Sequence, residues 1–386
     1  MDEELREQKI EYDTDVGDSL QALEEKYKEQ MRQIISQKIE LPIATLVGMI
    51  GKQIKLNPEF QRRDRWDVER QSRFIESIIM NVPVPPVFLG EETYGGYTVL
   101  DGRQRLTALY EFLRNSYPLK GLKVWAELNK SNIRELEKKG IDVMLLRRFL
   151  PAVVILKESS PQVKYDVFDR LNTGGVVANA MEIRNAVYPG RFNSHIHTLS
   201  DEPSFRRLWN IPLDNQERLT KPLYSKMYDL ELVLRFFALR DAQRMDLTFK
   251  DFLSDFMHRR NGAYQADPSL EAADTSMFLR TADNVWKVFG EDAFQKPGSK
   301  IKSAPLADGI MQALADIQPE SLDASVSDRI RRAILKAYEA DPAFQKAIST
   351  GTNGKGAITT RIDTAKRVVA AAVDGKDYEP DAIASK

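Results

Sequence analysis

The sequence contains no cysteine, only three histidines and no long apolar run. Without cysteine the chain can form no disulfide, thiol nucleophile or thiolate zinc site. His195 and His197 lie two residues apart in a predicted loop with no third ligand near them, so no metal site is expected there. No stretch approaches the length of a membrane span, and the N-terminus is acidic, so we expect a soluble, cytoplasmic protein.

An excess of charge of one sign is also missing. Lysine and arginine number 56 against 57 aspartate and glutamate, which gives a formal net charge of −1. Any surface that binds DNA must therefore come from local clustering of basic residues. Residues 1–18 hold eight acidic and two basic side chains and are predicted to be a flexible acidic tail. The 386 residues, 42% of them hydrophobic, are enough for two domains.

Predicted helices and strands alternate in the first half. Ser19 is a candidate N-cap for a helix that runs to about Gln37, and a second helix begins after Asp67. Residues 41–51 are predicted to be a short connecting element. The predicted strands are residues 87–89, 97–100, 122–126 and 152–156, of which the last is fully apolar and is expected at the centre of the sheet. These patterns predict a mixed α/β domain over residues 19–200.

After the last predicted strand the patterns are helical only. A helix is predicted from Ser160-Pro161 to the turn Asn172-Thr173-Gly174-Gly175. Asn179 and Glu182 have the spacing of a capping box, so a short helix should follow them. Further on, a helical stripe is formed by Leu230, Val233, Leu234 and Phe237, and helical segments follow at residues 276–289, 306–317, 326–339 and 359–373. We therefore predict an all-α domain over residues 201–386, and an α+β fold for the chain.

The turn Asp101-Gly102-Arg103-Gln104-Arg105 is the most informative feature of the chain. It joins a predicted strand to a predicted helix, whose first backbone N–H groups lack partners and favour an anion. Gly102 lets the backbone approach a ligand closely, while Arg103 and Arg105 each offer a planar guanidinium to phosphate oxygens. The alternative is a surface turn with solvated arginines, because short motifs often match by accident.

Several spaced motifs together resemble one known family. They are Asn57-Pro58-Glu59-Phe60-Gln61-Arg62, Trp66-Asp67, Ser72 to Ile78, Val82-Pro83-Val84-Pro85-Pro86, Asp101 to Arg105, Phe168 to Gly175 and Glu182 to Ala186. Their order over residues 40–200 is similar to that in the N-terminal domain family of GmrSD type, which has a ParB/sulfiredoxin-like fold. The helical remainder also resembles the C-terminal part of stand-alone members. Joint occurrence of several motifs is far more specific than the single turn.

The resemblance implies a core that binds a nucleoside triphosphate, and in characterised relatives hydrolyses it, within bacterial defence against modified phage DNA. The implied nucleotide-binding residues are Gln61, Arg62, Gly102, Arg103, Arg105, Asn172, Thr173 and Gly174. The catalytic candidates are Asp101, Glu76 and Gln104, which would orient water or a magnesium-bound oxygen. Mg²⁺ is inferred from phosphate chemistry, with no ligand set assigned. Arg103 departs from the glutamine usual at this place in the family.

Alternative interpretations remain open for some of these residues. Glu76 and Arg73 are three residues apart on one helix face and could form an ordinary ion pair. The Asn172 to Gly175 turn could be only a helix C-cap. Basic residues at positions 62–73 could instead follow a DNA backbone, although acidic neighbours dilute that track. The alternative to a nucleotide-binding sensor is therefore a DNA-binding, DNA-nicking or partner-binding module.

The histidines also bear on nuclease activity. Many family members carry an HNH-type nuclease, which needs a histidine general base, and none of the three histidines here has that context. We expect a nucleoside triphosphatase that does not cut DNA on its own. The candidate partners are a nucleoside triphosphate, DNA, a separate nuclease subunit and a further copy of the chain; no membrane partner is expected.

Overall fold

The computed structural model describes residues 23–25, 35–56, 66–159, 167 and 179–376, which fall into two compact units. Described residues up to 159 belong to the first unit and residues 179–376 to the second. The sequence-based domain limit was residue 200, whereas residues 179–200 group with the helices that follow them. No helix in the described part of the chain has the length and apolar character needed to cross a membrane.

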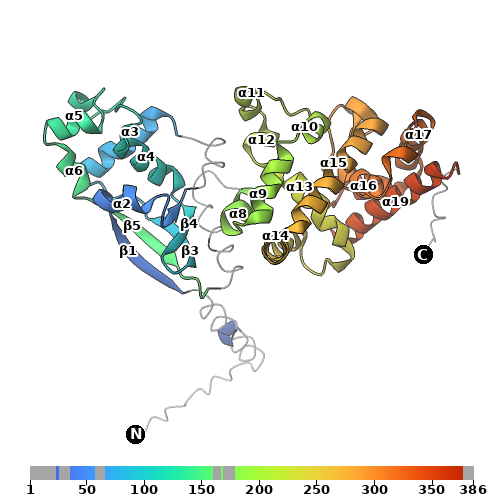
Figure 1. The fold of residues 1–386 in the computed structure, drawn as a ribbon, viewed down its shortest axis with the longest axis horizontal. Coiled ribbons are helices and arrows are strands. Elements are labelled where there is room, and N and C mark those ends of the chain that lie inside the picture. The colour runs from blue at the N-terminus through green and yellow to red at the C-terminus, as the bar shows by residue number, and fades with distance from the viewer. Residues whose placement is uncertain (1–22, 26–34, 57–65, 160–166, 168–178, 377–386) are drawn as a thin grey trace, which may run out of the picture. The chain divides into compact units, whose positions relative to one another are not determined.

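The first unit contains a five-stranded mixed sheet with helices gathered beside it (Figure 1). Its strands are β1 (Ser36–Pro42), β2 (Ile54–Lys55), β3 (Val87–Thr93), β4 (Gly96–Asp101) and β5 (Phe149–Ile155), in the spatial order β1-β5-β3-β4-β2. Its helices are α2 (Ile43–Met49), α3 (Val68–Ile79), α4 (Arg103–Leu113), α5 (Ile133–Lys138) and α6 (Asp142–Leu146), with a short 3₁₀ turn at Ala126–Leu128. The pairs β3–β5 and β2–β4 are parallel, whereas β1–β5 and β3–β4 are antiparallel.

Local chemistry explains the elements nearest the candidate site. Asp67 begins α3 because its side chain accepts a hydrogen bond from the backbone N–H of Arg70. One stripe of α3, including Phe74, Ile75 and Ile78, is buried in the same core as Val87 and Leu109. The β3–β4 hairpin turns at Gly95, which has a φ of 72°.

Four expectations for the first unit need correction. Residues 122–126 form no strand, because the backbone N–H groups at 123–125 bond to the Glu76 carboxylate instead of a strand partner. The predicted helix from Ser19 cannot reach Gln37, since β1 begins at Ser36; most of that segment lies outside the described residues. Residues 41–51, predicted to be a connecting element, contain the end of β1 and helix α2. The central strand is β3, with β5 beside it.

The second unit is built from helices, which confirms the α+β class of the chain (Figure 1). They are α8 (Ala180–Val187), α9 (Arg191–Ser200), α10 (Pro203–Trp209), α11 (Asn215–Leu219), α12 (Pro222–Ser225), α13 (Tyr228–Ala238), α14 (Phe249–Ala266), α15 (Ser269–Phe289), α16 (Ala304–Leu314), α17 (Ala324–Ala340), α18 (Pro342–Ser349) and α19 (Lys355–Val373), with short 3₁₀ segments between some of them. The predicted stripe on α13 is fully buried at Leu230, Val233 and Leu234.

Two sequence expectations for this unit meet different outcomes. Asn179 and Glu182 do form a reciprocal capping box at the start of α8, as predicted. His195 and His197, predicted to lie in a loop, belong instead to α9. His195 is buried, with ring nitrogens 2.8 Å from the hydroxyls of Tyr264 and Thr275, so it is a core residue of the helical unit.

Candidate functional site

The turn Asp101–Arg105, called the arginine turn below, lies between β4 and α4. Gly102 is the N-cap of α4 and has left-handed backbone angles, φ 88° and ψ 14°. A Cβ atom at this position would lie 2.5 Å from Cγ1 of Val87, so both the backbone conformation and the available space require glycine. The glycine thus lets the start of α4 approach the start of β3.

The guanidinium of Arg105 is held through one of its nitrogens, Nη2. Its Nη2 donates to Oδ2 of Asp101 at 2.8 Å and to the carbonyl oxygen of Pro86 at 3.2 Å. Its Nε is buried and has no hydrogen-bond partner in the described part of the chain. The side chain is 16% exposed, against 38% for Asp101. An anion that arrives from outside can therefore meet the exposed part of this guanidinium but not the buried Nε.

The amino end of α4 adds to the positive potential of the arginine turn. Gly102 has no side chain to cap this helix, and the positive end of the helix dipole lies at its start. Arg103 occupies the first helical position and is partly exposed. Burial of its guanidinium lowers the pKa of Arg103, which nevertheless stays charged at neutral pH. The helix dipole and two guanidiniums therefore favour a bound anion.

Gln104 connects the arginine turn to α3. Its Oε1 accepts a hydrogen bond from the backbone N–H of Trp66 at 3.2 Å. Trp66 in turn packs edge-on against Phe74 at 5.8 Å, and the Arg70 guanidinium lies 4.8 Å from its ring centre. Residue 66 directly follows the segment 57–65, which holds two of the predicted nucleotide-binding residues. Those two, Gln61 and Arg62, and also Asn172, Thr173 and Gly174, lie outside the described residues.

Glu76 is not brought to the arginine turn by any described contact. It is 6% exposed, and its Oε1 accepts hydrogen bonds from the backbone N–H groups of Val124 and Trp125, each at 2.9 Å. Its Oε2 lies 3.4 Å from the N–H of Lys123. This arrangement favours a structural role for Glu76, which holds the 123–125 backbone. Arg73 pairs with Glu69 at 2.5 Å rather than with Glu76.

The described residues contain no group of three or more His, Asp or Glu side chains that could hold a metal ion. At the arginine turn the carboxylate is that of Asp101, and Arg105 already binds one of its oxygens. A single carboxylate fits magnesium that arrives with a triphosphate, because such ions keep several waters and bind mainly to phosphate oxygens.

Two contributions to the arginine turn were not foreseen from the sequence. The Pro86 carbonyl accepts from Arg105, and the Trp66 amide donates to Gln104. The Pro85-Pro86 pair carried a signal, but it was interpreted only as a stop for the preceding helix. Backbone partners of this kind have no residue-type signature, so nothing in the sequence marks Trp66 as a donor.

Comparison with known proteins identifies the first unit and the start of the second. Residues 43–189 match the family model described as GmrSD restriction endonuclease, N-terminal domain, which confirms the predicted resemblance. The matched segment runs from α2 to the end of α8 and includes the arginine turn. No curated protein and no solved structure matches the chain. The match indicates a component of a restriction or defence system.

Proposed function

We propose, from the membership of residues 43–189 in the GmrSD N-terminal family, that this chain is the nucleoside-triphosphate-binding subunit of a bacterial modification-dependent restriction or anti-phage system. In this proposal the chain also hydrolyses the triphosphate, and a separate polypeptide cuts the DNA. The observation that carries the proposal is the arginine turn. There, the positive end of the α4 dipole and the guanidinium of Arg105, which Asp101 and Pro86 hold in place, favour a bound phosphate.

Each part of the arginine turn has a role in this proposal. The amino end of α4 attracts phosphate oxygens through the helix dipole, and Gly102 allows the left-handed turn that begins the helix beside Val87. Arg105 supplies charge at the place where negative charge develops during phosphoryl transfer, and its bonds to Asp101 and Pro86 hold it there. Asp101 orients the attacking water with the carboxylate oxygen that Arg105 does not bind. If magnesium is bound with the triphosphate, it would neutralise phosphate charge, and Asp101 is the carboxylate that the arginine turn could offer to it.

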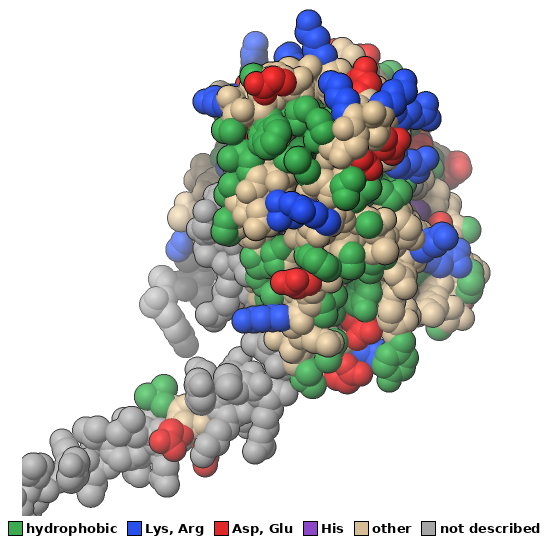
Figure 2. All heavy atoms as spheres, turned by 90° about the vertical axis from the view of Figure 1, so that its left-hand side faces the viewer, with side chains coloured by type: hydrophobic (Ala, Val, Ile, Leu, Met, Phe, Trp, Pro, Cys, Tyr) green, Lys and Arg blue, Asp and Glu red, His purple; other side chains and the backbone are tan. Residues whose placement is uncertain are grey.

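The DNA-binding alternative receives less support from the described residues. Arg73 is neutralised by Glu69, and Arg70 lies over the ring of Trp66. On the face drawn in Figure 2, basic and acidic side chains are interspersed with apolar ones and form no continuous basic track. The apolar side chains exposed near α6 in the first unit include Met80, Val82, Val143, Met144 and Phe149. A mixed surface of this kind attracts a phosphate backbone weakly.

Arg105→Ala tests the proposal. A hydrogen bond to a charged group contributes ~1.5–3 kcal/mol, so triphosphate binding should weaken by about 10-fold or more. Binding is measured by calorimetry with each of the four ribonucleoside triphosphates and magnesium, and far-UV circular dichroism checks the fold. The matched control is Arg114→Ala, which removes an exposed arginine at the other end of the same helix and should leave affinity unchanged.

Two outcomes would contradict the proposal. The first is that wild-type protein binds none of the four triphosphates. The second is that Arg105→Ala and Arg114→Ala bind with equal affinity. Arg105→Lys separates the two roles of the arginine, because lysine keeps the charge but cannot contact Asp101 and Pro86 with the same planar group. We expect partial affinity in that variant, and no DNA cleavage by any form of the chain alone.

A further inference from the structure

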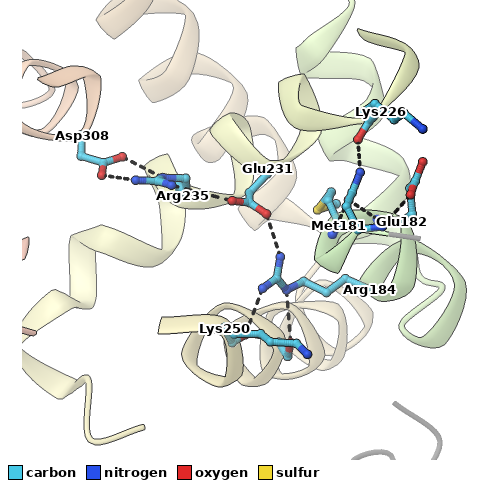
Figure 3. A network of polar contacts seen from close by, with 10 residues as sticks. Met181, Glu182, Arg184, Lys226, Glu231, Arg235, Lys250 and Asp308 are labelled. Carbon is cyan, nitrogen blue, oxygen red and sulfur yellow. Dashed lines mark hydrogen bonds and ion pairs between the residues drawn. The ribbon is translucent and has the colours of Figure 1, made fainter. Parts of the chain in front are cut away.

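The helical unit contains a chain of buried ionic contacts that runs from α8 to α19. Nη1 of Arg184 donates to Oε2 of Glu231 at 3.1 Å, and Oε1 of Glu231 lies 3.7 Å from Nη1 of Arg235. Arg235 binds both oxygens of Asp308, at 3.0 and 2.6 Å, and Figure 3 shows these four residues in line. Nη2 of Arg361 then binds Oδ2 of Asp308 at 2.5 Å. We call these five residues the ionic relay.

Burial makes the ionic relay costly to break. The side chains of Arg184, Asp308 and Arg361 are 1%, 4% and 0% exposed. Three arginines share two carboxylates, so each carboxylate pairs with two guanidiniums. Removal of one carboxylate leaves one buried arginine without a carboxylate partner and leaves Arg235 with one partner in place of two, and an unpaired buried charge is strongly destabilising. Through the shared carboxylates, the state of one pair affects the next.

The α8 end of the ionic relay is anchored beyond Glu231. Arg184 also donates to Oγ of Ser254 and to the backbone carbonyl of Lys250, both on α14. The α8 N-cap, Asn179, donates from Nδ2 to the carbonyl oxygen of Lys226 at 2.6 Å, just before α13. Residues 179–189 belong to the family-matched segment, yet their contacts are with the helices that follow it.

The α19 end reaches the turn that precedes this helix. Nη1 of Arg361 donates to the backbone carbonyls of Thr352 and Ala347, which belong to the turn and to α18. Gly309 lets α16 lie directly against α19, because a Cβ there would be 2.8 Å from the backbone oxygen of Arg361. The ionic relay therefore joins α8 with α13, α16 and α19.

We propose that the ionic relay makes α8, α13, α16 and α19 open and close as one cooperative element, through which the helical unit senses triphosphate bound by the family domain. The part that concerns nucleotide rests on the proposed function, whereas the cooperativity does not. The family-matched segment includes all of α8, so the matched domain that carries the arginine turn also supplies the first member of the relay, Arg184. A change in the packing of α8 is passed to Asp308 through three shared charged groups.

The test is amide hydrogen exchange on the full chain with Asp308→Asn. The amide that replaces the carboxylate has no charge, and its nitrogen cannot accept, so at least one of the three hydrogen bonds from Arg235 and Arg361 is lost together with both ion pairs. We therefore expect exchange in α8 to speed up at least ~10-fold, although Asp308 does not touch α8. The matched control is Asp316→Asn, which breaks the exposed pair with Arg240 just after the end of α16. Exchange in α8 should not change in that variant. Unchanged α8 exchange in Asp308→Asn, with α16 affected, would overturn the relay.

Two further measurements complete the test. If Asp308→Asn fails to fold, Arg361→Lys keeps the charge at the far end with a poorer fit, and it should speed α8 exchange by a smaller factor. Added triphosphate with magnesium should slow exchange in α8, α13 and α16 together in the wild type, but in α8 alone when the relay is broken. Lack of any triphosphate binding would refute the proposed function, while the exchange data without nucleotide would still decide for or against the relay.

Discussion

Substitution of Glu76 distinguishes a structural carboxylate from a catalytic one. Its Oε1 takes two short hydrogen bonds from the 124 and 125 amides, and Oε2 takes one long one. A hydrogen bond to a charged group contributes ~1.5–3 kcal/mol, and the freed amides can partly regain water because Val124 is exposed. We therefore expect Glu76→Ala to lower the free energy of unfolding by about 2–4 kcal/mol. At ~4 °C per kcal/mol, the first unit should melt about 8–16 °C lower.

Glu76→Gln should cost less than Glu76→Ala. A glutamine carbonyl placed at Oε1 keeps both short bonds but loses the charge and the long bond from Lys123, because its amide nitrogen cannot accept, so we expect a loss of about 1–2 kcal/mol. Differential scanning calorimetry measures both variants, with Glu69→Gln as the control on the same helix, because its exposed pair with Arg73 contributes less than ~1 kcal/mol. Wild-type melting in both Glu76 variants, with hydrolysis abolished in both, would refute the structural role and support the catalytic one.

Two further predictions concern one residue in each unit. Gly102→Ala should destabilise the first unit by about 2–4 kcal/mol in calorimetry, because the left-handed backbone and the contact with Val87 both oppose a Cβ. The control is Gly95→Ala, which has a φ of 72° but open space around it and should cost about half as much. Equal losses of stability in the two variants would contradict the steric argument. Burial lowers the pKa of His195 below its ordinary value of 6.5, so only the unfolded chain takes up a proton as the pH first falls below that value. The melting temperature of the helical unit should therefore fall with pH below about 6.5, and the fall should be shallower in His195→Gln; identical pH profiles would refute this assignment.

Periodicity and capping signals predicted several helices correctly, including α3, α8 and α13, but missed others such as α9 and α14. The correctly predicted features depend on neighbours within a few residues, so they can be predicted from local sequence. They are the capping box of Asn179 and Glu182, the start of α3 at Asp67 and the buried stripe through Leu234. The arginine turn was likewise predicted as a strand-to-helix junction, because Gly102 and the flanking patterns are local.

Long-range pairing could not be predicted in the same way. Residues 122–126 have a strand-like composition, but their amides bond to a glutamate almost fifty positions earlier. The helical pattern before Gln37 gave no sign that residues 36–42 pair with a strand near residue 150. The backbone partners of Glu76 could not be predicted for the same reason: a carboxylate on a helix face has the same sequence pattern whether it meets solvent, a guanidinium or a row of backbone amides.

The position of β1 has a consequence for how the chain is synthesised. Within the described part of the sheet, β1 lies at an edge and pairs with β5. Roughly 110 residues separate the two strands, which corresponds to on the order of ten seconds of translation. During that time β5 has not been synthesised, so β1 cannot form its native pairing and could pair with other unfolded chains. The sequence of β1 opposes such association. Lys38 and Glu40 place charge on the strand, and Pro42 ends it without an amide donor, and both features discourage pairing with a strand of another chain.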